Sequence, residues 1–213
     1  MLSRICGYLQ SALVAGNRAD RLAYLLASTL EDGDRILDVG AGDGRISRQI
    51  FDQRPSVSIE GIDVLLQKDS FMPVRQFDGS RIPYEDNSFD VVLFVDVLHH
   101  TDNAVTLLRE ARRVAKRAIV IKDHTCDGFF AFRTLQIMDY FGNAYCGVHL
   151  PYLYWPKRRW DQVFAELQLT VREWQSKLQL YPIPARWLFD RSLHFVAVLE
   201  FQESMTDDTR AHS

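Results

Sequence analysis

The sequence predicts an α/β fold in which helices cover both faces of a doubly wound, mostly parallel sheet. Strand-like apolar runs alternate with helical patterns from Arg35 to Lys122, and this alternation is typical of such sheets. Three of the runs are almost continuously apolar, as expected for strands that are buried on both faces. The chain has 213 residues, of which 47% are hydrophobic and 25% charged. We therefore expect one domain over residues 1–204 and a flexible tail over 205–213.

The N-terminal residues 1–31 are predicted to be helical, because leucines recur there at roughly helical spacing. Gln10 and Ser11 interrupt the apolar stretch, so we expect an amphipathic helix rather than a signal peptide. No apolar run approaches the length of a membrane span. The acidic tip at Glu31–Asp34 is predicted to be a turn that leads into the first strand.

Seven strands are predicted, and helical patterns separate most of them. A helix is expected after the first strand and another between the fourth and fifth, with Asp102 as its N-cap. About nine residues separate the second strand from the third, fewer than a parallel crossover normally needs, so a loop or a short turn of helix is expected there. The expected strands are Arg35–Val39, Val57–Val64, Val74–Phe77, Phe89–Val97, Ala118–Lys122, Thr170–Leu178 and Leu193–Phe201.

An aromatic-rich insertion is predicted over residues 125–155, directly after the fifth strand. Its pattern suggests a helix that ends near Gly142, and Pro156 can open the next helix. The segment would serve either as a lid that excludes water from an active site or as a packing or dimer surface. As a lid it would offer Phe129, His149 and Tyr152 to a substrate.

Composition excludes several other classes. The formal net charge of −3 argues against a nucleic-acid binder, and the basic run from Arg109 to Arg117 is interpreted as a solvated helix face. The three cysteines, Cys6, Cys126 and Cys146, show no CxxC spacing, so neither a disulfide framework nor a metal site is expected. Unpaired thiols fit a reducing cytoplasm.

The glycine turn after the first strand indicates a nucleotide-type ligand. Gly40, Gly42 and Gly44 follow a strand and precede a helix, where the backbone must turn sharply and approach a ligand closely. The dinucleotide fingerprint would place a third glycine at position 45, where Arg45 stands. Asp63, at the end of the second strand, is placed to accept hydrogen bonds from a ribose diol.

A third motif indicates which protein family the sequence resembles. The segment FDGSRIPYEDNSFDVVLFVDVLHH leads from Phe77 into the fourth strand, after LDVGAGDG and GIDV and before LLREARRVAKRAIVIKD. Together these motifs resemble class I S-adenosylmethionine-dependent methyltransferases, especially the type-11 group with its ubiquinone- and menaquinone-pathway enzymes. The resemblance covers roughly Ile36 to Lys122. It implies a Rossmann-like sheet of seven strands with one antiparallel strand, and S-adenosyl-L-methionine as cofactor with S-adenosyl-L-homocysteine as product.

The resemblance also implies roles for individual residues. The methionine part of the cofactor would lie on the glycine turn and over the end of the fourth strand, and the nucleoside part near the second and third strands. The residues so implied are Asp38, which shapes the turn; Gly40, Ala41 and Gly42, which hold the methionine; Asp63 on the ribose; Val64, Asp78 and Gly79 on the adenine; and Val95 and Asp96 under the methionine.

Candidate bases follow the fourth and fifth strands, where open α/β sheets bind ligands. His124 is a candidate base with Asp123 to orient it, and His100 is a second candidate. Each has a purely structural alternative: His100 packs against cofactor or backbone, His124 bonds its neighbouring loop and Asp123 caps a turn.

The expected activity is methyl transfer to a small-molecule acceptor in a biosynthetic pathway, in a cytoplasmic monomer or homodimer. The alternatives are a non-catalytic scaffold with this fold, a nicotinamide-dependent oxidoreductase and, disfavoured by charge, an RNA methyltransferase.

Overall fold

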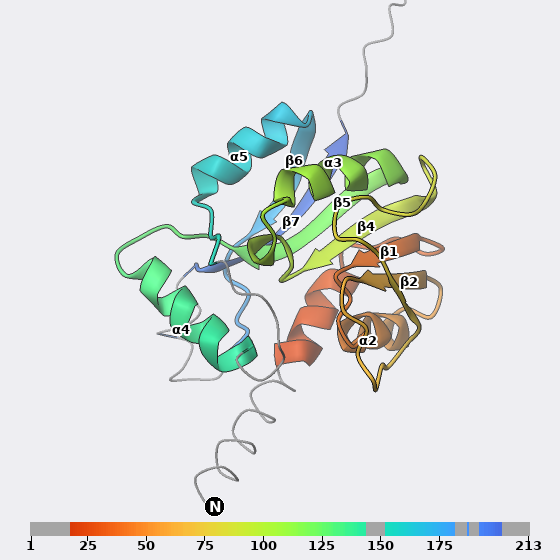
Figure 1. The fold of residues 1–213 in the computed structure, drawn as a ribbon, viewed down its shortest axis with the longest axis horizontal. Helices are drawn as coiled ribbons and strands as arrows, with labels where there is room; N and C mark the ends of the chain where they lie inside the picture. Colours follow the sequence, from red (N-terminus) through yellow and green to blue (C-terminus); the bar gives the residue numbers. More distant parts are fainter. Residues whose placement is uncertain (1–17, 144–151, 182–186, 188–191, 202–213) are drawn as a thin grey trace, which may run out of the picture.

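The computed structural model describes residues 18–143, 152–181, 187 and 192–201, with a central sheet between two layers of helices (Figure 1). Its seven strands lie in the order β3-β2-β1-β4-β5-β7-β6. β7 runs antiparallel to both β5 and β6, so the predicted sheet with one antiparallel strand is confirmed. The strands are β1 (Arg35–Val39), β2 (Ser58–Asp63), β3 (Val74–Gln76), β4 (Phe89–Val95), β5 (Ala115–His124), β6 (Leu169–Gln175) and β7 (His194–Phe201).

The helices divide between the two faces of the sheet. Residues 18–27 and α2 (Arg45–Gln53) cover one face, while α3 (Ala104–Val114) and α5 (Lys157–Glu166) cover the other. A 3₁₀ turn (Leu98–His100) follows β4, and α4 (Ala131–Asn143) follows β5. None of the described helices combines the length and the apolarity that a bilayer crossing requires.

The two core clusters follow from the alternation of side chains along the strands. In β4, Val92 and Phe94 pack with α3 and α5, whereas Val91 and Leu93 pack with the helix at 18–27 and α2. All four side chains are almost fully buried. This two-sided burial explains why the strand reads as a continuous apolar run.

Several local predictions need adjustment. The helix after the fourth strand begins at Ala104 with Asn103 as its N-cap, so the assignment of the cap to Asp102 is wrong. Thr101 explains the shift, because its hydroxyl accepts the N–H of Asn103 at 3.0 Å and holds the entry one residue later. β5 is also longer than predicted, which places His124 inside the strand. The β2–β3 connection is a loop without helix, one of the two expected alternatives. Residues 1–17 and the tail at 205–213 lie outside the described part.

Arg113 departs from the solvated face predicted for the basic run. Its guanidinium donates to the carbonyl oxygens of Ile82 at 3.0 Å and Tyr84 at 2.8 Å. It also pairs with Asp86 at 2.9 Å and with Glu110 at 2.7 Å. A single side chain of α3 thus ties down the segment that leads into β4.

Candidate active site

The glycine turn joins β1 to α2 in a left-handed backbone conformation. Gly40, Gly42 and Gly44 have φ of 81°, 57° and 74°, where residues with a Cβ are strained. The N–H of Gly40 donates to the Ile62 carbonyl at 2.8 Å, which fixes the turn against β2. A Cβ on Gly40 would lie 2.4 Å from Cγ2 of Val97, so the turn also packs tightly on the segment after β4.

A cavity of about 340 Å³ opens beside this turn. It lies at the carboxyl ends of β1, β2 and β4, where ligands bind in open α/β sheets. Six of the ten residues predicted for the cofactor line it. The lining consists of Gly40, Gly42, Asp63, Val64, Leu65, Gln67, Phe77, Gly79, Asp96, Val97, His100, Thr101 and Leu107. We call it the glycine-turn cavity.

Asp63 stands at the end of β2 with its carboxylate beside the turn. Oδ2 accepts the N–H of Gly42 at 2.8 Å, and Oδ1 accepts the N–H of Leu65 at 2.9 Å. Each carboxylate oxygen can accept a second hydrogen bond. The carboxylate is therefore oriented by the backbone and retains capacity for two hydroxyl donors, which suits the diol of a ribose.

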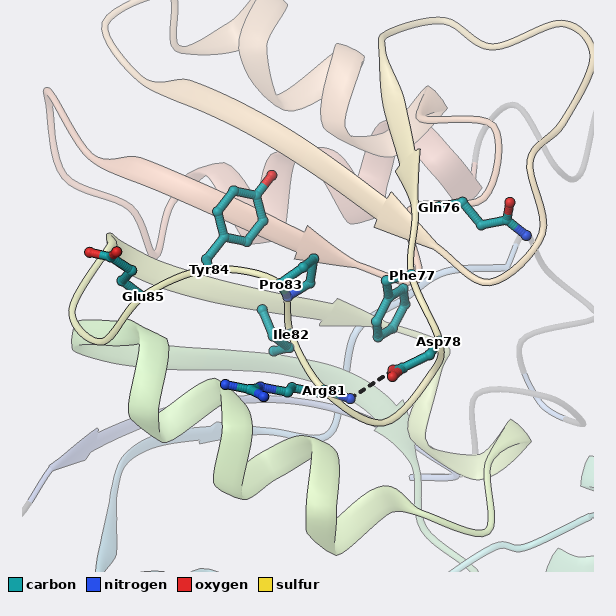
Figure 2. Close-up of a pocket in the computed structure, with 8 residues that line it drawn as sticks. All are labelled: Gln76, Phe77, Asp78, Arg81, Ile82, Pro83, Tyr84 and Glu85. Carbon is teal, nitrogen blue, oxygen red and sulfur yellow. Dashed lines mark hydrogen bonds between the residues drawn. The ribbon is translucent and has the colours of Figure 1, made fainter.

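Asp78 lies on a second cavity, of about 520 Å³, which Figure 2 shows. Its Oδ1 accepts the N–H groups of Ser80 and Arg81, both at 2.8 Å, and these bonds lower its pKa. Phe77 belongs to the linings of both cavities, whereas Asp78 lines only the second. The structure thus places Gly79, but not the Asp78 side chain, at the glycine-turn cavity.

Three further predicted residues, Asp38, Ala41 and Val95, do not line the glycine-turn cavity. Asp38 is buried beneath the turn and accepts the hydroxyl of Ser47 at 2.6 Å. Burial raises the pKa of Asp38 to about 6. These contacts lie beneath the turn that Asp38 was expected to shape.

Asp123 binds His99 more closely than it binds His124. Its Oδ1 lies 2.6 Å from Nδ1 of His99 and 3.3 Å from Nδ1 of His124. The carboxylate also accepts the backbone N–H groups of Leu98 at 3.0 Å and His124 at 2.8 Å. An ionised carboxylate only accepts, so Nδ1 of His99 carries the proton. Burial alone would raise the pKa of Asp123, but the charge of His99 and these hydrogen bonds hold it below its usual value.

His124 is buried and electrostatically unsuited to carry a proton. Burial, followed by the charge of Lys122, lowers its pKa to about 3. Its backbone carbonyl accepts the indole N–H of Trp160 at 3.1 Å, and its ring lies edge-on to His99. His100, by contrast, lines the glycine-turn cavity, and its ring centroid lies 3.9 Å from the ring centroid of His99.

A buried charge cluster lies behind this cavity, and the sequence-based reasoning missed most of it. Asp96 forms ion pairs with Lys122 and, at 2.5 Å, with Arg18. Burial would raise the pKa of Asp96, but the two cations outweigh it and hold that pKa well below its usual value. His194 of β7 lies 3.4 Å from Nζ of Lys122. One signal was present in the sequence, namely a lysine at the end of the apolar run AIVIK.

The aromatic segment is described only in part. Phe129 is 81% exposed, and Tyr152 packs against the small cluster around Leu135 and Tyr154. Tyr154 is buried next to the rings of His99 and His124. His149 lies outside the described residues, as do Cys6 and Cys146, and Cys126 has a free thiol.

Known proteins resemble this chain in both sequence and fold. Residues 37–121 match a family model described as a methyltransferase domain. A stretch of 110 residues is 31% identical to 27-O-demethylrifamycin SV methyltransferase of Amycolatopsis mediterranei and covers 46% of this chain and 39% of that protein. Another of 99 residues is 30% identical to the ubiquinone/menaquinone biosynthesis C-methyltransferase UbiE of Neisseria meningitidis and covers 41% and 40%. The aligned part thus spans about two fifths of each relative.

Among solved structures, a Haloferax volcanii chain described as a putative methyltransferase, in complex with the Trm112 methyltransferase activator, has a TM-score of 0.64. It is 16% identical, and the superposition covers 90% of this chain and 94% of that one. This likeness establishes the fold, and the family match adds the motifs of the glycine turn, Asp63 and the β4 strand. Over residues 37–121 the chain is similar to the methyltransferase domain family, and its fold is that of solved methyltransferases.

Proposed function

We propose that this chain transfers a methyl group from S-adenosyl-L-methionine to a small organic acceptor. The observation that carries the proposal is the single cavity that contains Gly40, Gly42, Asp63 and Gly79. Its backbone is shaped for close approach of a ligand, and its carboxylate is preset for two hydroxyl donors. S-adenosylmethionine supplies an electrophilic methyl group when bound, and methyl transfer to a nucleophile is an in-line displacement.

The residues of the cavity would contribute mainly by orientation. Asp63 would hold the ribose of the cofactor, and the glycine turn would hold its amino-acid chain. Holding two reactants in line is worth roughly 7–11 kcal/mol in favourable cases. We assign the adenine to the surface formed by Val64 and Gly79, both of which line the cavity. Asp78 binds the N–H groups of Ser80 and Arg81 through Oδ1, and its side chain lines the second cavity rather than this one.

We propose that the Asp123–His99 pair assists the removal of an acceptor proton at His100, which lines the cavity and whose ring packs on that of His99. The carboxylate holds the proton of His99 on Nδ1, so Nε2 is the unprotonated ring nitrogen, and this atom is buried. His124 was the first candidate from the sequence. Its pKa of about 3 makes it a weak base, so we assign it to the support of the other two rings.

The acceptor class rests on the relatives and on the aromatic segment. Two similar proteins are described as methyltransferases for a rifamycin and for ubiquinone or menaquinone biosynthesis. We propose that Phe129 and Tyr152, from the described part of the aromatic segment, contact the acceptor; the role predicted for His149 falls outside the described residues. A cytoplasmic location, the absence of nucleic-acid partners and a monomeric or homodimeric state remain predictions.

Calorimetry of the full chain with S-adenosylhomocysteine tests the proposal. We expect saturable binding at micromolar concentrations and none with NAD. Tighter binding of NAD would favour a nicotinamide-dependent oxidoreductase. A screen of candidate metabolites with methyl-labelled cofactor measures turnover. Binding of S-adenosylhomocysteine without turnover in that screen would favour a non-catalytic subunit.

A further inference from the structure

A cluster of polar side chains lies next to the glycine-turn cavity, at the neighbouring strand ends of the sheet. Its members are Arg18, Asp96, Lys122, Tyr181 and His194, and we call it the Arg18 cluster. Asp96 connects the two places, because it lines the cavity and forms ion pairs with Arg18 and Lys122. The chemistry described above makes no use of the other four side chains.

The strand order places this cluster directly beside the cavity. In the sheet, β4 is followed by β5 and then by β7 (Figure 1). Because β7 is antiparallel to β5, its beginning meets the carboxyl end of β5, where His194 pairs with His124. On the other side of the cavity, Phe77 and Gly79 already form part of its lining. A second reactant that meets a ligand of the cavity therefore finds its place over the ends of β5 and β7.

The cluster carries one more positive than negative charge. Burial would raise the pKa of Asp96, but Lys122 and Arg18 hold that pKa well below its usual value, so the carboxylate is ionised. Burial lowers the pKa of Lys122, and the ion pair with Asp96 opposes that effect. His194 is neutral, because burial and the charge of Lys122 lower its pKa well below the usual value. The next carboxylate, that of Asp123, is engaged by a histidine and by backbone N–H groups.

Two buried donors of the cluster have no hydrogen-bond partner among the described residues, namely Nε of Arg18 and Nε2 of His194. Nδ1 of His194 lies 3.4 Å from Nζ of Lys122. An ammonium group only donates, so Nδ1 accepts and the ring proton of His194 lies on Nε2. A buried donor without a partner costs free energy. Two such donors beside an excess of positive charge are suited to an oxyanion.

Flat rings surround these donors. The ring centroid of His194 lies 4.7 Å from that of His124 and 5.7 Å from that of Tyr181. The side chain of Arg18 is 29% exposed, whereas Lys122 is completely buried. A ligand can therefore reach the guanidinium group, with the second cation behind it.

We propose that the Arg18 cluster recognises the acidic group of a small aromatic methyl acceptor, such as a carboxylate. The inference deepens the proposed function and rests on it, since the acceptor belongs to that function. The guanidinium of Arg18 donates to the oxyanion, and Nε2 of His194 is the further donor. The charge of the acceptor balances the second cation, and its ring packs against the rings of His194 and Tyr181.

A divalent metal is the competing occupant, because Asp96, His99 and His124 offer ligand atoms within 4.8 Å of one another. Arg18 and Lys122 argue against it, since both already bind the carboxylate that the metal would need. A metal would also add two positive charges to a buried site that already holds two cations. The charges present therefore favour an anion.

The experiment compares para-fluorobenzoate with para-fluorobenzamide, which have nearly the same shape and differ by one charge. Fluorine NMR titration of the full chain, saturated with S-adenosylhomocysteine, gives the affinity of each probe for the parent and for Arg18→Gln. Calorimetry gives the affinity of S-adenosylhomocysteine with and without the benzoate. The matched control is Arg48→Gln, because Arg48 lies on α2, half-exposed and paired with Asp52.

We expect the parent to bind the benzoate about tenfold or more tightly than the benzamide. Arg18→Gln should reduce this preference to about twofold or less, and Arg48→Gln should leave it unchanged. The benzoate should not weaken the binding of S-adenosylhomocysteine, because the two ligands occupy neighbouring places. If Arg18→Gln does not fold, His194→Phe removes the other donor while keeping a ring and should reduce the same preference.

Three results would overturn the inference. A parent that shows no preference for the acid has a cluster balanced from within, as by an ionised Tyr181. Equal weakening of both probes by Arg18→Gln would mean that Arg18 acts only on the fold, and competition between the benzoate and S-adenosylhomocysteine would place the acid in the cofactor cavity. A preference that a chelator abolishes would favour the metal and also contradict the inference. Failure of the parent to bind S-adenosylhomocysteine defeats the proposed function itself, whereas normal binding without acid preference defeats the inference alone.

Discussion

Replacing Gly40 by alanine tests whether the glycine turn is shaped by its contact with the end of β4. The new Cβ would occupy a backbone with φ of 81° and would lie 2.4 and 2.8 Å from the two methyl carbons of Val97. The left-handed conformation costs roughly 1–2 kcal/mol, and overpacking adds about 1–3 kcal/mol. We therefore expect a loss of about 2–5 kcal/mol in the free energy of unfolding.

Thermal unfolding and calorimetry measure the two consequences. In a chain of this size, each kcal/mol lowers Tm by about 2–4 °C, so a decrease of about 4–20 °C is expected. Binding of S-adenosylhomocysteine should weaken at the same time, because the turn must move away from Val97.

Gly33→Ala is the matched control, since φ is 86° there but no atom lies within 4 Å of the added Cβ. It should show the backbone strain alone, about 1–2 kcal/mol, and normal ligand binding. Adding Val97→Ala to Gly40→Ala should recover part of the loss, because it removes the two methyl groups that clash. If Gly40→Ala costs no more than Gly33→Ala and binds ligand normally, the proposed packing of the turn is refuted.

Three further predictions concern the cavity and the buried carboxylates. Asp63→Ala should weaken S-adenosylhomocysteine binding by about tenfold or more, because it removes the ribose acceptor, and calorimetry that shows parental affinity would contradict this role. Once an acceptor is known, His99→Gln should lower kcat by about 10²–10⁴-fold with little change in cofactor affinity, whereas a larger effect of His124→Gln in steady-state kinetics would restore His124 as the base. The Asp38→Asn variant should gain stability relative to the parent as pH rises from about 4 to about 6, with a plateau above. The sign follows because the folded pKa of Asp38 is raised from 3.8 to about 6, so its favourable contribution is complete below pH 3.8 and is lost as pH rises through the folded pKa. The difference approaches about 3 kcal/mol at the plateau, and a flat difference in denaturant melts would rule out the buried charge.

Local patterns made most of the fold predictable. The strand Arg35–Val39 was predicted with its observed ends, because an acidic turn precedes it and glycines follow it. Asp63 could be placed because the carboxyl ends of parallel strands meet at one edge of the sheet. The family resemblance implied an antiparallel strand, which is β7. Its register could not be predicted from local sequence patterns, because it depends on pairings such as His124 with His194, seventy residues apart in the chain.

The side-chain partners of the site were less predictable. Asp123 was expected to orient its neighbour in sequence, but its carboxylate lies closer to Nδ1 of His99, in the 3₁₀ turn after β4, than to Nδ1 of His124, a preference that depends on how the fold places the turn. Lys122 was overlooked since a lysine at a strand end is normally solvated, and only the fold brings Asp96 to it. The carboxylate of Asp78 is engaged by the backbone of its own turn, a local competition that the motif does not reveal.

The contacts of Arg113 connect the outer surface of α3 with the nucleoside end of the cavity. Arg113 donates hydrogen bonds to the carbonyl oxygens of Ile82 and Tyr84, which lie a few residues beyond Gly79. The opposite face of α3 packs into the core. The segment that carries Gly79 is therefore held in place by a side chain that lies outside the cavity. Asp86 and Glu110 form ion pairs with the Arg113 guanidinium. Substitution of either residue is therefore expected to change ligand affinity, although neither lines the glycine-turn cavity.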